Sequence, residues 1–242
     1  MKKQLTVLAA GAHPDDIDIC CAGTLARYVN EGHKVFISIT CKGNAGTLEK
    51  SADEIVRIRQ AEAERSAAKI GATLIMLGFG DAELVHDKAS LATFIDLVRR
   101  TRPDVIITHP REEEDWHNDH MLTRRLIMDA SIWATHHNLW VKSEFPPSEV
   151  TPSLFYFDMS SSGLRDRPSH YVDITDTFDK KIEALKQHQS QLEFLSGLFG
   201  GDPLEGVKLQ SRLRGKQCGV EYAEAFQECA VYPRVRPYRV LP

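Results

Sequence analysis

Residues 5–41 read LTVLAAGAHPDDIDICCAGTLARYVNEGHKVFISITC, and this stretch decides the fold. Its first residues, Leu5–Ala10, form an apolar run of strand length, and Lys34–Cys41 is rich in β-branched residues, as buried strands are. Between them, Ala22–Asn30 has a helical pattern and is followed by Glu31-Gly32, a helix-stop signal. The order strand, helix, strand is typical of a parallel sheet with helices packed against it.

The same alternation continues along the chain. Ser51-Ala52-Asp53-Glu54 has the spacing of a capping box and predicts a long helix to about Ile70, with Gly71 just beyond its end. The next predicted elements are the strand Leu74–Leu77, the helix Leu91–Arg100, the strand Val105–Thr108 and a helix from about Met121 to Thr135. We therefore predict an α/β fold, with a Rossmann-like, mostly parallel sheet covered by helices on both faces, and a single domain over residues 1–242.

The last third of the chain has weaker patterns. Leu154–Phe157 is predicted to be a strand, and apolar residues at helical spacing predict one amphipathic helix over about Thr177–Phe199. A Gly/Pro-rich segment from Gly200 and a short helix near Tyr222–Cys229 are expected to follow. We interpret the final arginines as part of a solvated or subunit-contacting tail; they are Arg234, Arg236 and Arg239.

Composition excludes several classes of function. The 242 residues contain 30 Lys and Arg against 34 Asp and Glu, a formal net charge of −4, so we expect no nucleic-acid partner of the kind that polycations bind. No stretch approaches the ~20 apolar residues that a bilayer span needs, so we expect no membrane partner. The five cysteines form no CxxC pair, and a polar cluster follows the first apolar run, so we predict a reducing, cytoplasmic location without a signal peptide.

Two polar clusters follow predicted strands, at the end of the sheet where α/β proteins bind ligands. His13-Pro14-Asp15-Asp16 comes after the first strand, and residues 109–120, HPREEEDWHNDH, come after Val105–Thr108. Imidazole and carboxylate ligands favour a borderline cation such as Zn²⁺, and catalytic zinc sites use three protein ligands and a water. These residues therefore indicate a metal hydrolase with two histidines and one aspartate as ligands and another carboxylate as general base.

These patterns leave alternatives open. They do not distinguish Asp15 from Asp16, or His117 from His120, as ligand or catalytic group. Asp16 and Asp119 could instead cap helices, because aspartate is common at that position. The glycine-containing loop Lys42–Gly46 could contact a substrate, but we interpret it as a plain connection.

Five motifs follow one another along the chain: Ala12-His13-Pro14-Asp15-Asp16-Ile17-Asp18-Ile19, Arg59-Gln60-Ala61-Glu62, His117-Asn118-Asp119-His120, His188-Gln189-Ser190-Gln191 and Glu224-Ala225-Phe226. In this order they resemble the motifs of the LmbE/PIG-L family of zinc-dependent N-acetylglucosaminyl deacetylases. Two departures stand out. Asp18 occupies a position where the family often has Glu, and Cys20-Cys21-Ala22-Gly23 replaces a glycine-richer run.

The resemblance implies a role for each matching residue. His13, Asp16 and His120 match the zinc ligands, and Asp15 matches the general base. His117 matches the residue that stabilises the oxyanion. Asp119 matches its orienting partner, and Arg59 matches an arginine of the substrate pocket.

Other polar residues receive lesser roles. We expect His109 to hydrogen-bond to residues of the site without lining the pocket itself. We expect His188 to be a hydrogen-bonded, partly buried residue, and His136-His137 to lie on the surface. The acidic segment Arg111–Asp115 is expected to be solvated.

The resemblance therefore implies a Zn²⁺-dependent N-deacetylase, with another divalent ion as the alternative. We expect it to remove the acetyl group of a small N-acetylglucosamine-type sugar or glycoside, with a metal-bound water as nucleophile. An amidase that acts on a thiol-sugar conjugate and a non-catalytic metal- or sugar-binding protein are the alternative functions. The oligomeric state is left open by the sequence; the resemblance makes a homo-oligomer possible, since some relatives form trimers or hexamers.

Overall fold

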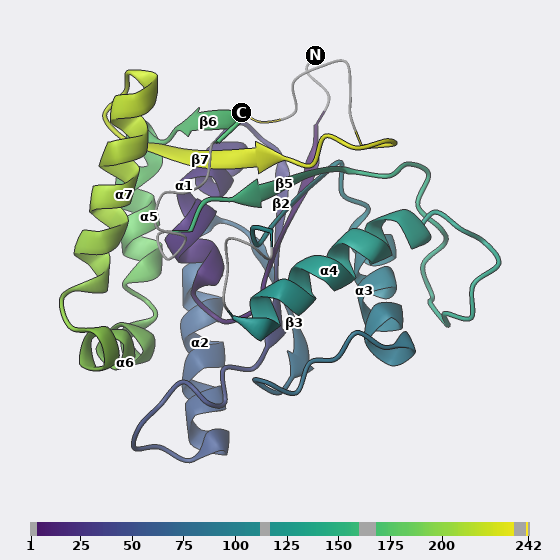
Figure 1. The fold of residues 1–242 in the computed structure, drawn as a ribbon, viewed down its shortest axis with the longest axis horizontal. Helices are drawn as coiled ribbons and strands as arrows, with labels where there is room; N and C mark the ends of the chain where they lie inside the picture. The colour runs from purple at the N-terminus through teal and green to yellow at the C-terminus, as the bar shows by residue number, and fades with distance from the viewer. Residues whose placement is uncertain (1–3, 112–116, 160–167, 235–240, 242) are drawn as a thin grey trace.

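The computed structural model describes residues 4–111, 117–159, 168–234 and 241 (Figure 1). Strands and helices alternate over its first half, as the sequence predicts. In chain order the elements are β1 (Thr6–Gly11), α1 (Asp16–Asn30), β2 (Lys34–Cys41), α2 (Ala52–Ile70), β3 (Thr73–Phe79), α3 (Lys88–Thr101), β4 (Val105–Thr108), α4 (Asn118–Trp133), β5 (Ser153–Phe157), β6 (His170–Asp173), α5 (Phe178–Leu185), α6 (Gln189–Phe199), α7 (Pro203–Cys218) and β7 (Ala223–Glu228).

The strands of the described residues form one seven-stranded sheet in the order β3-β2-β1-β4-β5-β7-β6. The first five strands in that order run parallel, and β7 runs antiparallel to both of its neighbours. The predicted α/β class and mostly parallel sheet are confirmed. The assignment of the whole chain to one domain stays a prediction.

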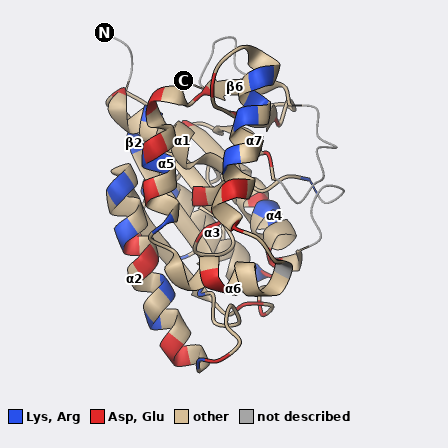
Figure 2. Ribbon diagram, turned by 90° about the vertical axis from the view of Figure 1, so that its left-hand side faces the viewer, with Lys and Arg blue, Asp and Glu red and all other residues tan. Residues whose placement is uncertain are grey.

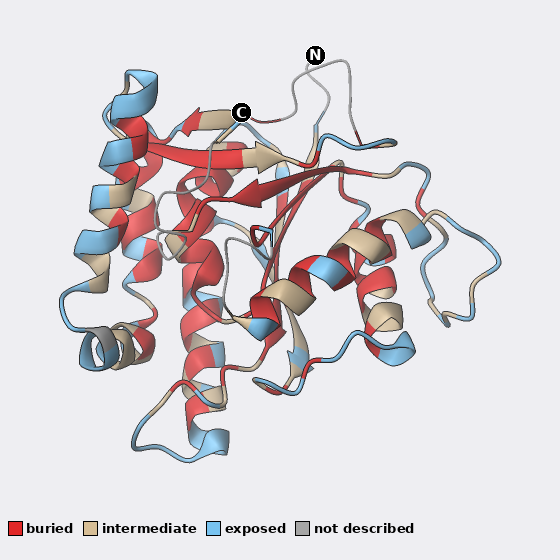
Figure 3. Cartoon of the chain, in the orientation of Figure 1, coloured by how far each residue is buried: buried red, intermediate tan, exposed pale blue. Residues whose placement is uncertain are grey.

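Helices cover both faces of the sheet, so its central strands are buried on both sides (Figure 3). On β1, Val7 and Ala9 pack into the core beneath α1, α2 and α5, whereas Leu8 and Ala10 pack into the core beneath α3 and α4. Alternation between two apolar environments explains why β1 is a continuous apolar run in the sequence.

The predicted long helix begins and ends where the sequence indicates. The Ser51 side chain accepts a hydrogen bond from the backbone N–H of Glu54, and Gly71 ends α2 with φ 90°, a conformation that glycine adopts without strain. Figure 2 shows basic and acidic residues interspersed along the outer face of α2. Among the described residues, no helix combines the length and apolar character needed to cross a membrane.

The single helix expected over Thr177–Phe199 is wrong. The chain forms α5 and α6 instead, and His188 at the break has φ −85° and ψ 50°. The His188 side chain lies 3.0 Å from Asp18 on α1, a contact between residues 170 positions apart that no local pattern signals.

Three expectations for the end of the chain are also wrong. The segment after Gly200 contains the helix α7, and Tyr222–Cys229 contains the strand β7 rather than a helix. Its alanine and glutamate residues favour helix locally, but pairing with β5 and β6 outweighs that preference. Arg234 is buried and donates to Ser131 Oγ and Met128 O, both at 2.8 Å, so it does not belong to a solvated tail. Arg236 and Arg239 lie outside the described residues.

Candidate metal centre and active site

Two polar segments meet at the carboxyl ends of β1 and β4. These strands pair in parallel, with Ala10 opposite Thr108, so the residues that follow them lie side by side. The backbone N–H of Ala12 donates to Nε2 of His109 at 2.9 Å and ties the two segments together. The expected meeting of the two sequence clusters at one edge of the sheet is confirmed.

His13, Asp16 and His120 converge at this edge. Nδ1 of His13 lies 3.2 Å from Nε2 of His120 and 3.6 Å from Oδ2 of Asp16, and Nε2 of His120 lies 3.5 Å from Oδ1 of Asp16. Ligand atoms about 2.1 Å from a tetrahedral metal ion are separated by about 3.4 Å. The spacing and the chemistry of these donors therefore fit a zinc-sized divalent cation.

Other combinations of side chains at this edge also lie within ligand distance of one another. Among the described residues they are His13 with His117 and His120, Asp16 with His109 and His120, and His13 with Cys41 and Asp119. Nε2 of His109 accepts the Ala12 N–H and Nδ1 of His117 accepts the Asp119 N–H at 3.2 Å, so each ring has one lone pair engaged by the backbone. These contacts favour His13, Asp16 and His120 as the ligand set.

Asp119 lies on the far side of the His13 ring. Its Oδ2 is 3.2 Å from Nε2 of His13 and accepts the backbone N–H of Ala82 at 2.9 Å. A carboxylate at Nε2 favours a proton on that nitrogen, which leaves the Nδ1 lone pair directed to the cluster, an arrangement common in metal sites. Asp119 reaches His117 through its backbone N–H, so its carboxylate pairs with His13.

Asp15 is buried beside the cluster and is paired with Arg59. Nη2 of Arg59 donates to Oδ1 of Asp15 at 2.9 Å and to the carbonyl of Pro14 at 3.2 Å. Burial raises the pKa of Asp15 to about 6, against the opposing effect of the Arg59 charge. A carboxyl group with a pKa near neutrality beside a cation site is suited to general acid–base catalysis.

The backbone of Asp15 is strained. It has φ 151° and ψ −25°, a region that residues other than glycine rarely adopt. Asp15 also occupies the position before α1 without capping the helix through its side chain. Asp16 does not cap α1 either; its Oδ2 accepts the backbone N–H of His13 at 2.6 Å. Neither carboxylate is thus explained as a helix cap.

His117 is the residue immediately before α4, which it caps, and is partly exposed. Its Nδ1 accepts the Asp119 N–H, so the proton of the neutral ring is on Nε2, where it can act as a donor. Burial, followed by the neighbouring charges of His13 and His120, lowers the pKa of His117. The ring stacks on His120 with centroids 4.6 Å apart, which places it next to the ligand cluster.

The electrostatics of the cluster favour a positive charge. Burial alone would lower the pKa of His13, but hydrogen bonds to Asp119 and Asp16 outweigh it and raise the value to about 10. Burial would likewise raise the pKa of Asp16, but His120, together with His109 and His13, holds it well below its usual range. The carboxylates that stabilise a proton on His13 would equally stabilise a divalent cation.

Arg59 is nearly inaccessible to solvent, with 3% of its surface exposed. Its guanidinium lies against Gly43 and Gly46, where an added Cβ would collide with it. The loop that contains these glycines is fixed by Asp81, whose carboxylate accepts the N–H groups of Gly43 and Ala45, each at 2.8 Å. The loop therefore packs around Arg59. Direct contact between Arg59 and a substrate stays a prediction.

A buried polar layer lies behind Asp15. Asp18 accepts a hydrogen bond from Ser66 Oγ and lies 3.0 Å from Nε2 of His188. Glu62 accepts both the backbone N–H and the hydroxyl of Ser190, at 2.9 and 2.6 Å. These contacts agree with the expected hydrogen-bonded role of His188 and give Asp18 a contact with the residue that precedes α6.

Cys41, the last residue of β2, was not among the predicted site residues, but its Sγ lies within 4.8 Å of ligand atoms of His13 and Asp119. The signal in the sequence was its position, because β2 ends at the same edge of the sheet as β1.

His136 and His137 are exposed, as expected. The acidic segment Arg111–Asp115 lies outside the described residues except for Arg111.

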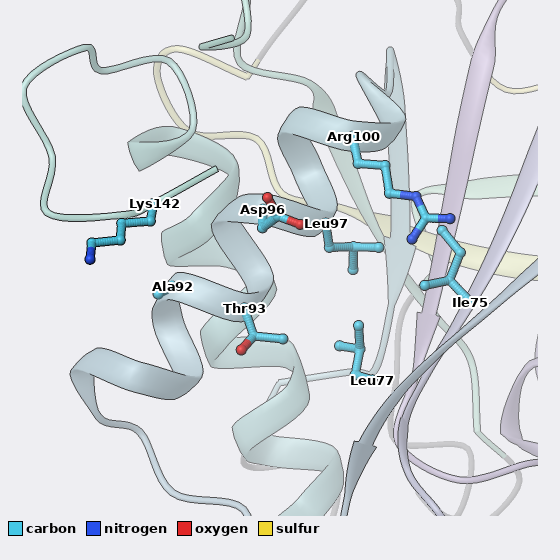
Figure 4. A pocket seen from close by; sticks show the side chains of 8 residues that line it. All are labelled: Ile75, Leu77, Ala92, Thr93, Asp96, Leu97, Arg100 and Lys142. Carbon is cyan, nitrogen blue, oxygen red and sulfur yellow. The ribbon is translucent and has the colours of Figure 1, made fainter. Parts of the chain in front are cut away.

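A separate cavity of about 320 Å³ lies beside β3 and α3 and contains none of the predicted site residues (Figure 4). Its lining residues are Ile75, Leu77, Ala92, Thr93, Asp96, Leu97, Arg100 and Lys142. The absence of histidines and of any candidate catalytic pair among these residues makes the strand-end cluster the candidate active site.

The fold and the strand-end cluster define an α/β protein with a His/Asp centre suited to a divalent cation. Residues 8–131 match the PIG-L family, described as GlcNAc-PI de-N-acetylase, and the chain belongs to this family. The resemblance inferred from the motifs is confirmed.

Similar proteins have more than one activity. The chain is 29% identical over 227 residues to a diacetylchitobiose deacetylase of Thermococcus kodakarensis, covering 91% of this chain and 82% of that protein. It is 26% identical over 245 residues to a 4-oxalmesaconate hydratase of Pseudomonas putida, covering 96% and 91%. A solved N,N'-diacetylchitobiose deacetylase from Pyrococcus horikoshii has the same fold, with a TM-score of 0.82, 23% identity and coverage of 98% and 88%.

Proposed function

We propose that this chain is a metal-dependent N-deacetylase that hydrolyses the acetamido group of a small N-acetylglucosamine-type sugar or glycoside. The observation that carries the proposal is the position of Asp15, a buried carboxyl group adjacent to a cation-sized His/Asp cluster and held by Arg59. A protein that only binds a metal or a sugar has no need for such a base. The diacetylchitobiose deacetylase supports the choice of substrate class.

In this proposal His13, Asp16 and His120 hold Zn²⁺ or another divalent ion. The ion supplies Lewis-acid activation of a water molecule and of the amide carbonyl. Asp15 accepts a proton from the attacking water and later donates it to the nitrogen of the leaving amine. Arg59 keeps the Asp15 carboxylate in one orientation while the proton moves.

His117 stabilises the negative charge that develops on the amide oxygen. Its Nδ1 is occupied by the Asp119 N–H, so Nε2 carries the proton and donates a hydrogen bond to the oxyanion. The Asp119 carboxylate acts through His13, holding the Nε2 proton so that Nδ1 faces the metal position. Asp119 is thus a positioning residue in this proposal.

A hydratase is a second candidate function, because the chain also matches a 4-oxalmesaconate hydratase over most of both sequences. Adding water to a carbon–carbon double bond would use the same base, Asp15, but would release no amine. An amidase that acts on a thiol-sugar conjugate would release an amine from a different substrate, as the relative named mycothiol S-conjugate amidase suggests.

The test is turnover by metal-loaded protein on a panel of substrates. Diacetylchitobiose, N-acetylglucosamine, a thiol-sugar conjugate and 4-oxalmesaconate are incubated separately, and free amine, acetate and double-bond absorbance are measured. Release of equal amounts of amine and acetate from an acetylated sugar supports the deacetylase. If metal-loaded protein releases neither product from any acetylated sugar, the proposal fails, and loss of double-bond absorbance identifies the hydratase.

A further inference from the structure

His13 has a second donor atom, and it faces a second set of metal-binding groups. Nδ1 faces Asp16 and His120, whereas Nε2 faces Asp119. Ligand atoms of His13, Cys41 and Asp119 all lie within 4.8 Å of one another. These three residues come from the loop after β1, the end of β2 and the first turn of α4, and the backbone N–H of Cys41 donates to the carbonyl of Ala12 at 2.7 Å.

Two features distinguish this group from an incidental cluster of side chains. Two of its residues are fully buried, and one of its carboxylate oxygens has no hydrogen-bond partner among the described residues. Cys41 and Asp119 both have 0% of their surface exposed. Oδ1 of Asp119 has no hydrogen-bond partner among the described residues, although Oδ2 contacts His13 and Ala82. A buried carboxylate oxygen without a partner calls for a proton donor or a cation.

The donor types specify the class of cation. A thiolate sulfur, an imidazole nitrogen and a carboxylate oxygen together favour Zn²⁺, Co²⁺ or Cd²⁺ over Mg²⁺ or Ca²⁺, which prefer oxygen ligands alone. Nε2 of His13 and Oδ2 of Asp119 are 3.2 Å apart, close to the separation of two ligands of one tetrahedral zinc ion.

We propose that Cys41, Asp119 and Nε2 of His13 form a second metal site for a thiophilic divalent cation, which shares the His13 ring with the candidate catalytic cluster. Binding releases two protons to solvent, one from the thiol of Cys41 and one from Nε2 of His13. The His13 ring then bridges the two sites as an imidazolate, and no group is oxidised or reduced.

The second site fills after the first. Binding at the second site displaces two protons, one from Cys41 and one from Nε2 of His13, whereas Nδ1 of His13 and the Asp16 carboxylate already face the first position. Occupation also removes the Nε2 proton that Asp119 holds on His13. On the proposed function, an excess of metal therefore inhibits the enzyme, but binding itself does not depend on the reaction.

The binding test is a Co²⁺ titration of the metal-stripped full chain, read by absorption without substrate. Ligands at the first site contain no sulfur, so its filling produces no thiolate-to-cobalt charge-transfer band. We expect that band to appear only as a second equivalent binds. Cys41→Ser is expected to abolish the band and reduce the stoichiometry from two ions per chain to one, whereas Cys218→Ser, at an exposed cysteine away from the site, leaves both unchanged.

Other outcomes overturn the proposal. A wild-type titration that ends at one ion per chain without a charge-transfer band excludes the site, whether or not the variants fold. A band that survives in folded Cys41→Ser assigns the sulfur to another cysteine. If the second ion binds as proposed but no substrate is turned over at one equivalent, the proposed function fails and the metal site stands.

Discussion

Arg59 Nη2 donates to Asp15 Oδ1 across 2.9 Å, and both side chains are more than nine-tenths buried. Helix α2 thereby holds a carboxylate that belongs to the loop after β1. The guanidinium is itself confined by Gly43 and Gly46. The orientation of the candidate base thus depends on two loops and one helix that are separate in sequence.

Asp15→Asn tests the assignment of the base. An amide cannot accept the proton of the attacking water, so we expect kcat to fall by about 10²–10⁴-fold. Because Asp15 is not in the proposed ligand set, the metal content measured by mass spectrometry should remain at the wild-type level. Loss of the metal from the folded variant would assign Asp15 to the ligands instead.

His120→Ala and His117→Ala separate ligand from oxyanion donor. Removing His120 should eliminate most bound metal, because only two protein ligands remain. Removing His117 should preserve the metal but lower kcat by about 10²–10³-fold, the usual cost of one oxyanion donor. Metal stoichiometry and kcat are measured on the same preparations. Equal metal content in the two variants contradicts the assignment.

Gly46→Ala tests how the position of Arg59 affects catalysis. The added methyl group would collide with the end of the buried Arg59 side chain and with Oε1 of Gln191, and would move the guanidinium away from Asp15. We expect kcat to fall about tenfold, equivalent to about 1.4 kcal/mol, and Tm to fall as well, because the buried pair with Asp15 is weakened. Gly206→Ala is the control, since its Cβ meets nothing within 4 Å and should leave kcat unchanged. Unchanged kcat in Gly46→Ala would show that Arg59 tolerates displacement.

Lys181 and Glu224 form a buried ion pair that joins α5 and β7 to α1. Lys181 Nζ donates to Glu224 Oε1 at 2.5 Å and to the carbonyl of Ile19 at 2.8 Å, while Glu224 accepts the N–H groups of Gly23 and Thr24. Both side chains therefore hydrogen-bond to backbone groups of α1. Removing one charge leaves the other buried and uncompensated.

Lys181→Met should therefore lower the free energy of unfolding by about 3–5 kcal/mol, measured by urea denaturation. Adding Glu224→Gln to that variant should recover part of the lost stability, because burying a neutral amide costs less free energy than burying an unpaired carboxylate. Lys208→Met removes the exposed pair with Glu205 and should change stability little. A double variant less stable than Lys181→Met would indicate that the Gly23 and Thr24 contacts dominate.

His188 makes stability depend on pH. Burial lowers the pKa of His188, but Asp18, with Asp15 and Glu62, outweighs it and raises the pKa above the ordinary value of 6.5. A raised pKa stabilises the fold below the unfolded value, and that contribution is lost as pH rises through the folded value. The stability difference between wild type and His188→Gln should thus shrink over the pH range above the ordinary value of 6.5. A constant difference across that range contradicts a charged His188.

Sequence alone determined the architecture of the first half of the chain. Apolar runs and helix signals depend on near neighbours, so they predicted β1, α2 and β4 and the cluster of His13 and His120 at the strand ends. They could not predict β7, because its residues favour helix until β5 and β6 supply strand partners.

Only the tertiary structure decided how individual atoms of the site are paired. His13 and Asp119 are 106 positions apart, and their contact selects which nitrogen of His13 faces the candidate metal position. The motif places Asp119 two residues after His117, yet its carboxylate lies on His13. Cys41 likewise joins the site only because β2 packs beside β1. Local sequence specifies backbone periodicity, whereas the partner of each side-chain atom depends on segments that folding brings together.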